Sequence, residues 1–121
     1  LRDVADEVAV LGSTDLTHYG PRYGFTPQGV GERALAWAKQ TNDASVLRAI
    51  ETLDAETVVD ETIRHQSACG GGAIAVTLAA ASELGATRGV ILEHITSADV
   101  MRDRFGESSE DSVGYASAVL G

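Results

Sequence analysis

The pattern of apolar and polar positions predicts an α/β fold. Three stretches are typical of strands: the short apolar run at residues 8–11 and the longer apolar-rich stretches at 89–95 and 112–120. Residues 97–111 are polar, acidic and rich in turn-forming residues, so we expect an exposed excursion between the last two strands. With helical patterns filling the middle of the chain, we predict a layered sheet with helices on both faces.

The first helical pattern covers residues 28–40. Apolar side chains recur there at i, i+4, i+7 and i+8, with Trp37 as a core anchor. A second pattern with one apolar face follows from residue 46 to 53, and residues 41–43 supply an N-cap for it. The two segments either form separate helices or merge into one.

Two more helices are predicted after residue 53. Asp54 is a suitable N-cap for a helix over residues 55–65, where the apolar spacing follows the helical template closely. Residues 73–84 are apolar nearly all round, which is typical of a helix in the interior of a domain. Gly85 suits the residue just past its end.

Composition narrows the classes of partner. The chain has 121 residues, enough for one domain, and its net charge of −9 comes without any basic stripe, so we expect no nucleic-acid or membrane partner. The longest apolar run, residues 73–81, is too short to cross a bilayer. A single cysteine suits a reducing compartment, and we expect a cytoplasmic protein.

A cluster of polar, titratable residues follows the first predicted strand, at residues 13–20. A buried strand that ends in such a cluster is how open α/β sheets form sites. Asp15 lies close enough in sequence to His18 to orient or charge its imidazole. The alternative is a polar turn in which Asp15 caps backbone amides, and the residues alone do not decide. Tyr19, Tyr23 and Phe25 either line a pocket or pin this region to the core, with pinning favoured for Phe25.

Cys69 is the second candidate. It precedes three glycines and a predicted helix start, where free amide groups favour an anion and would make the thiol a better nucleophile or metal ligand. The alternative is a small buried side chain beside a glycine-rich turn, which the residues alone slightly favour. His65 fits a favourable position at a helix C-terminus, and His94, next to Glu93, is a weak site candidate.

Several motifs resemble the MEMO family, also called AmmeMemoRadiSam system protein B. Residues 13–20, Ser-Thr-Asp-Leu-Thr-His-Tyr-Gly, resemble its S-[ST]-D-L-[ST]-H-[YW]-G signature. Further resemblances follow in the family's order: Leu53-Asp54, Ala68-Cys69-Gly70, Ser97-Ala98-Asp99 and Ser112-Val113-Gly114-Tyr115-Ala116. The resemblance implies a fold similar to class III extradiol (LigB-type) dioxygenases.

The resemblance also implies a metal pocket holding iron, as Fe(II), or copper, through two histidines and a cysteine. Carried over by position, Cys69 is a metal ligand, with Asp15 and His18 as polar partners. We therefore expect Cys69 and His18 as metal ligands, and His18 and Asp15 as catalytic residues. The family's two ligand histidines lie in an N-terminal half, so residues 1–121 are expected to be a C-terminal half. His65 and His94 match neither ligand position.

The function implied by the resemblance is that of a non-haem metal-dependent oxidoreductase. One alternative is a binding or adaptor module with a vestigial metal site, in which Arg22 and Arg64 are candidates for recognising a phosphorylated peptide. Another is an accessory protein of a radical-SAM-linked modification system. The expected partners are the N-terminal half or a second chain, a small-molecule or peptide ligand, and a further copy of the chain. A half sheet would leave an apolar face and a strand edge uncovered.

Overall fold

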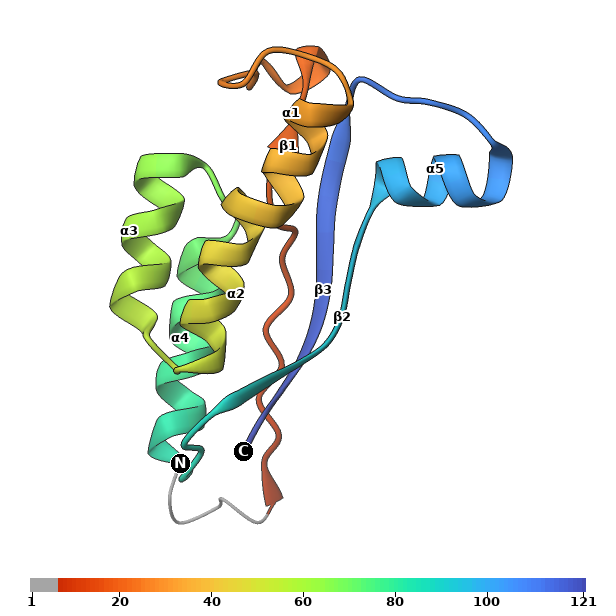
Figure 1. Cartoon of the computed structure of the whole chain (residues 1–121). Helices are drawn as coiled ribbons and strands as arrows, with labels where there is room; N and C mark the ends of the chain where they lie inside the picture. The colour runs from red at the N-terminus through yellow and green to blue at the C-terminus, as the bar shows by residue number, and fades with distance from the viewer. Residues whose placement is uncertain (1–6) are drawn as a thin grey trace.

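A three-stranded antiparallel sheet forms the centre of the fold (Figure 1). The computed structural model describes residues 7–121, and the N-terminal connector expected at residues 1–6 lies outside them. Strand β3 (Ser112–Leu120) lies between β1 (His18–Tyr19) and β2 (Gly89–Thr96). It pairs with β2 along its length but with β1 at only two positions.

The predicted fold class is confirmed, with helices on both sides of the strands. Figure 1 shows the helices α1 (Glu32–Trp37), α2 (Ala44–Glu51), α3 (Ala55–His65) and α4 (Gly71–Glu83) on one side and α5 (Ser97–Phe105) on the other. Strands β2 and β3 were both predicted. Among the described residues, no helix has the length and apolarity needed to cross a membrane.

The buried strand predicted at residues 8–11 is wrong. The segment forms no strand, and its large side chains are exposed, Leu11 by 91%. An apolar run becomes a buried strand only if a neighbouring strand and a covering layer take it up. Here the segment instead lines a cavity of about 620 Å³ that also touches α4 and the end of β3.

Helices α1 and α2 merge through a π-helical segment, η3 (Ala38–Asp43). The N-cap predicted at residues 41–43 is therefore wrong: the backbone of Asp43 is helical, at φ −61° and ψ −43°, and its side chain caps nothing. Asn42 and Asp43 are buried and bond to other parts of the chain. Polar residues that resemble a helix start are here used for tertiary contacts.

Helix α3 has the predicted bounds and the predicted N-cap. Asp54 accepts a hydrogen bond from the amide of Thr57 at 3.0 Å. A second bond, from the Thr57 hydroxyl, is the main cause that lowers the pKa of the Asp54 carboxyl, and the bond from the Thr57 amide lowers it further. A local capping pattern next to a regular apolar spacing was sufficient to place this helix.

Helix α4 is less buried than predicted. Gly71, Ile74 and Leu78 face the other helices, whereas Val76 on the far side is 70% exposed. The helix is apolar all round, but only one face is covered within the described residues. Gly85 follows its end with a φ of 103°, as predicted, which a residue with a side chain rarely adopts.

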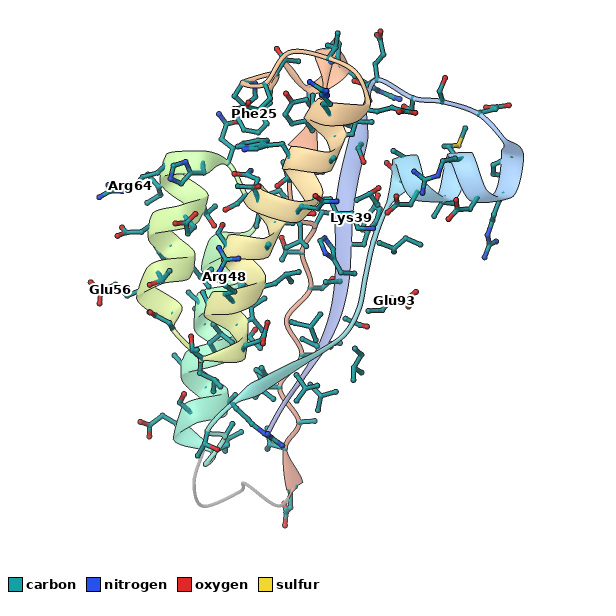
Figure 2. All side chains as sticks on the ribbon, in the orientation of Figure 1. Phe25, Lys39, Arg48, Glu56, Arg64 and Glu93 are labelled. Carbon is teal, nitrogen blue, oxygen red and sulfur yellow. The ribbon has the colours of Figure 1, made fainter. Side chains whose placement is uncertain are left out.

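Part of the expected excursion at residues 97–111 is helix α5. No residue of α5 is buried, which agrees with the predicted exposure of this stretch. Its helical structure was not predicted. Thr96 and Asp99 form a capping box, each side chain accepting a hydrogen bond from the other's backbone amide. Asp99 also forms a 2.6 Å ion pair with Lys39 of η3, and Figure 2 shows Lys39 lying beside the start of α5.

Two apolar clusters hold the elements together. The larger joins the helices to the chain before β1 and contains Leu16, Val46, Leu47, Ala49, Val58, Ala68, Ile74 and Leu78. The smaller centres on Tyr19, which is fully buried and makes edge-on ring contacts with Phe25 and Trp37. Phe25 thus pins its loop, and Trp37 is a half-buried anchor, as predicted. The tyrosine hydroxyl also donates to the carbonyl of Gly29 at 2.8 Å.

The strands leave apolar side chains in solvent. Val90, Leu92 and Val119 on β2 and β3 are exposed, Leu92 by 63%. Glu93 also points away from the helices in Figure 2. The expectation of an uncovered apolar face is thus confirmed for the described residues.

Candidate functional site

The two predicted site regions meet in space. Asp15 and His18 come from residues 14–18, a loop that ends at the first residue of β1, and Cys69 comes from the loop at residues 66–69; we call these the first and second loops. A short backbone pairing joins them, because the amide of Cys69 donates to the carbonyl of Asp15 at 3.2 Å and Leu16 forms a β-bridge with Ala68. Side chains 51 or more residues apart in sequence are therefore held together by the main chain.

Asp15, His18 and Cys69 present ligand-type atoms that all lie within 4.8 Å of one another. His18 Nε2 lies 3.5 Å from Asp15 Oδ2, and both side chains are partly exposed. Within residues 7–121, no hydrogen bond from a backbone amide to the Asp15 carboxylate occurs, so the alternative of a capping aspartate is not observed. The Tyr23 ring lies against the imidazole, with ring centres 5.2 Å apart.

The Cys69 side chain is exposed, so the alternative of a small buried cysteine is wrong. Its sulfur lies 3.3 Å from the hydroxyl oxygen of Thr14 in the first loop. Glycine is required next to it, since a Cβ at Gly70 would overlap the Thr14 side chain and one at Gly71 would overlap Thr62. Gly70 and Gly71, for which the sequence predicted an anion-binding role, allow close packing of the two loops and of α3 on α4.

An open hollow of about 370 Å³ lies over these groups. It is lined by His18, Tyr23, Thr62, Gln66, Ala68 and Cys69. Thr62 and Gln66 escaped sequence analysis because isolated polar residues at the end of a helix carry no pattern. Gln66 has a positive φ of 50°, which ends α3 and turns the chain towards Cys69.

Tyr115 of β3 is a further residue near the site. Partial burial raises the pKa of its phenol, and the negative charge of Asp15 adds to that rise. It belongs to one of the motifs noted in the sequence, which gave it no role. Tyr115 does not line the hollow, so its place near the site rests on its interaction with the Asp15 charge.

The other histidines lie elsewhere. His65 is the last residue of α3 and is exposed, as expected for a favourable position at a helix C-terminus. His94 Nε2 lies 2.9 Å from Asp43 Oδ2, in a pair away from the hollow. Within residues 7–121, only Asp15, His18 and Cys69 form a group of three with metal-ligand spacing.

Comparison with known sequences finds one matching family, described as Memo-like protein, whose profile covers residues 1–119. A "MEMO1 family protein" of Pyrococcus furiosus is 30% identical over 120 residues, which cover 98% of this chain and 39% of that protein. Another, of Methanopyrus kandleri, is 34% identical over 123 residues, covering 98% of this chain and 37% of that protein.

A third relative, a "MEMO1 family protein" of Methanothermobacter thermautotrophicus, is 33% identical over 118 residues, covering 96% of this chain and 35% of that protein. The chain therefore spans less than half the length of the relatives it matches. The region of similarity includes both loops of the candidate site.

Proposed function

Since this chain belongs to the Memo-like protein family, we propose that Asp15, His18 and Cys69 form one wall of a metal site with oxidoreductase activity. The observation that carries the proposal is their convergence from two distant loops to within 4.8 Å. The position of His18 and Cys69 on the wall of an open hollow supports it, because a metal and a substrate both need access.

The donor set fits a redox-active transition metal. A thiolate and an imidazole suit copper or iron better than they suit magnesium or calcium, which prefer oxygen ligands. Two ligands about 2.0–2.3 Å from one ion are at most about 4.6 Å apart, so small side-chain rotations would bring these three atoms to binding distance. We propose Cys69 and His18 as ligands, and Fe(II) or copper as the metal.

When bound, such an ion would supply one-electron chemistry. The chain's own contribution is to position groups and to hold a proton. The Asp15 carboxylate, 3.5 Å from His18 Nε2, orients the imidazole, and the Tyr23 ring limits its rotation. His18 would bind the metal through one ring nitrogen, and its other ring nitrogen together with Asp15 is our candidate for holding and moving a proton beside the metal.

The three groups do not complete a site. Catalytic metal sites commonly use three protein ligands, and here the carboxylate is already directed at the histidine. We propose that further ligands come from the part of the family's length that this chain does not span, its N-terminal half, and that residues 1–121 act as the C-terminal half. The unfilled apolar cavity beside residues 8–12 and the exposed Leu92 support such a partner.

A binding or adaptor role is the second candidate, and the arrangement of charges does not favour it. Neither Arg22 nor Arg64 lines the hollow, and Figure 2 shows Arg64 pointing outward from α3. Recognition of a phosphorylated peptide needs cations at the mouth of its pocket. A metal-independent peptide affinity would nevertheless revive this alternative.

The proposal is tested by metal content. The chain is purified with and without an N-terminal half of a Memo-family protein supplied as a second polypeptide, and iron and copper are measured by elemental analysis. We expect about one ion per complex, lost in Cys69→Ser and reduced in His18→Gln. Glu56→Gln, at an exposed position of α3 that does not line the hollow, is the matched control and should keep the metal.

Substrate consumption is then measured as oxygen uptake by the metal-loaded complex. Absence of bound metal in every preparation, or equal metal content in Cys69→Ser and the unmodified protein, would contradict the metal site. Metal binding without oxygen uptake would contradict only the oxidoreductase activity.

A further inference from the structure

The two loops of the candidate site are both tied to one pair of consecutive residues, Asn42 and Asp43, at the end of η3. The Asp43 carboxylate accepts a hydrogen bond from the amide of Thr17 through Oδ1 at 2.9 Å. Asn42 Nδ2 donates to the Thr17 hydroxyl oxygen at 3.1 Å and to the carbonyl of His65 at 3.0 Å. Thr17 precedes His18 in the first loop, and His65 immediately precedes the second loop.

The two bonds to Thr17 are buried, so water cannot easily replace them, and the bond to His65 is partly buried. Asp43 is 1% exposed and Asn42 4% exposed. A buried carboxylate that loses its partner is left without solvation, which makes its hydrogen bonds more persistent than those of a surface aspartate. The second carboxylate oxygen, Oδ2, is occupied by His94 Nε2 of β2 at 2.9 Å.

The sheet fixes the pair from the other side. Gly114 of β3 packs directly on the Asp43 carboxylate, because a Cβ there would overlap it. The same glycine exchanges backbone hydrogen bonds with the first loop: its amide donates to the carbonyl of Thr17 at 3.0 Å, and its carbonyl accepts from the amide of Leu16 at 2.9 Å. Thr17 is thus held by both the helix and the strand.

The π-helical geometry contributes to this arrangement. Consecutive side chains of an α-helix point about 100° apart, and a π segment changes the direction in which the following side chains point, which is why such segments often mark functional sites. In η3, Asn42 and Asp43 both reach Thr17. An N-cap role, which the sequence pattern predicted for these residues, would not explain why both side chains are buried and bonded to Thr17.

We propose that Asn42 and Asp43 are positioning residues that set the distance between the His18 and Cys69 side chains by holding the two loops at a fixed separation. Neither residue touches the hollow. The predicted effect on metal affinity rests on the proposed metal site. The positioning of the loops does not, since the hydrogen bonds from Asn42 and Asp43 to Thr17 and His65 are present without a metal.

The experiment compares Asp43→Ala and Asn42→Ala with the conservative Asp43→Asn. An asparagine keeps the volume and an oxygen that accepts from Thr17, while His94 can present an acceptor nitrogen to the new amide group. The control is Val46→Ala, which removes buried volume from the core one turn further along α2 without a hydrogen bond to either loop. Amide hydrogen exchange of Thr17 and Cys69 is measured by NMR in the 121-residue chain, corrected for the change in global stability.

We expect exchange at both amides to be about tenfold faster or more in Asp43→Ala, since one charge-assisted bond is lost. Asn42→Ala should mainly speed exchange at the Cys69 amide. In Asp43→Asn, both exchange rates should stay within about threefold of those in the unmodified chain. In the metal-binding complex, Co²⁺ serves as the probe, through its thiolate charge-transfer absorption. Its dissociation constant should rise by about tenfold in Asp43→Ala and be restored in Asp43→Asn.

Exchange in Asp43→Ala that equals Val46→Ala after correction would overturn the proposal. So would faster exchange at Thr17 alone, with Cys69 protection and Co²⁺ affinity unchanged, because the loops would then not be coupled. If the unmodified complex binds no Co²⁺, the proposed function fails, and the two exchange rates alone decide whether the positioning residues act as proposed.

Discussion

The ion pair between Asp99 and Lys39 makes a quantitative prediction about stability and pH. Partial burial by itself raises the pKa of the Asp99 carboxyl. Hydrogen bonds from Lys39 and from the backbone and side chain of Thr96, with the charge of Lys39, outweigh that effect and lower the pKa from 3.8 to about 2. The side chain is only 15% exposed, so solvent screening removes little of the effect.

The sign of the pH dependence follows from that direction. Because the folded-state pKa lies below the unfolded value of 3.8, the deprotonated carboxylate stabilises the fold above about pH 5. One pKa unit corresponds to about 1.4 kcal/mol, so the contribution to the free energy of unfolding is about 2 kcal/mol at pH 7. It should fall to about half that value at pH 3, since it is lost as the pH falls towards the folded-state pKa.

The assay is urea unfolding of the unmodified chain and of Asp99→Asn between pH 3 and pH 7. Asparagine keeps an oxygen for the amide of Thr96 but removes the charge. Asp103→Asn is the matched control on the same helix, because Asp103 is 64% exposed and solvent screening should leave its pair with Arg102 little effect on stability. A stability difference for Asp99→Asn that stays constant across this pH range, or that equals the control, would refute the reasoning.

Two core substitutions extend the account. Leu78→Ala should lower the free energy of unfolding, measured in urea, by about 3 kcal/mol, because Leu78 is 1% exposed in the larger cluster. A loss of less than about 1 kcal/mol would show that α4 does not pack there as described. Gly114→Ala should lower the free energy of unfolding by about 2 kcal/mol or more, because the new Cβ would overlap the Asp43 carboxylate. Unchanged stability together with an unchanged hydrogen-exchange rate at the Thr17 amide would contradict that contact.

Local patterns were sufficient wherever the structure depends on local interactions. Helix α3 needed only its apolar spacing and the Asp54 cap, and β2 and β3 needed only apolar-rich stretches bounded by turns. The site loops were also found from sequence, because a polar cluster at 13–20 and a cysteine before three glycines are unusual locally. Their juxtaposition became an expectation only through the family resemblance.

The errors come from contacts between distant residues. Residues 8–11 look like a buried strand but have no covering layer among the described residues, so their side chains are exposed. Asn42 and Asp43 look like a helix start, yet their side chains bond to Thr17, 25 or more residues away in sequence. The pair of His94 with Asp43 links positions 51 residues apart, and no spacing rule predicts it.

The central claim is that Cys69 and His18 bind one metal ion. X-ray absorption at the iron or copper edge, on the metal-loaded complex of this chain with a Memo-family N-terminal half, tests it most directly. We predict one sulfur ligand and at least one imidazole, with the sulfur absent in Cys69→Ser and one imidazole fewer in His18→Gln. A metal that keeps the same ligand shell in both variants would contradict the account.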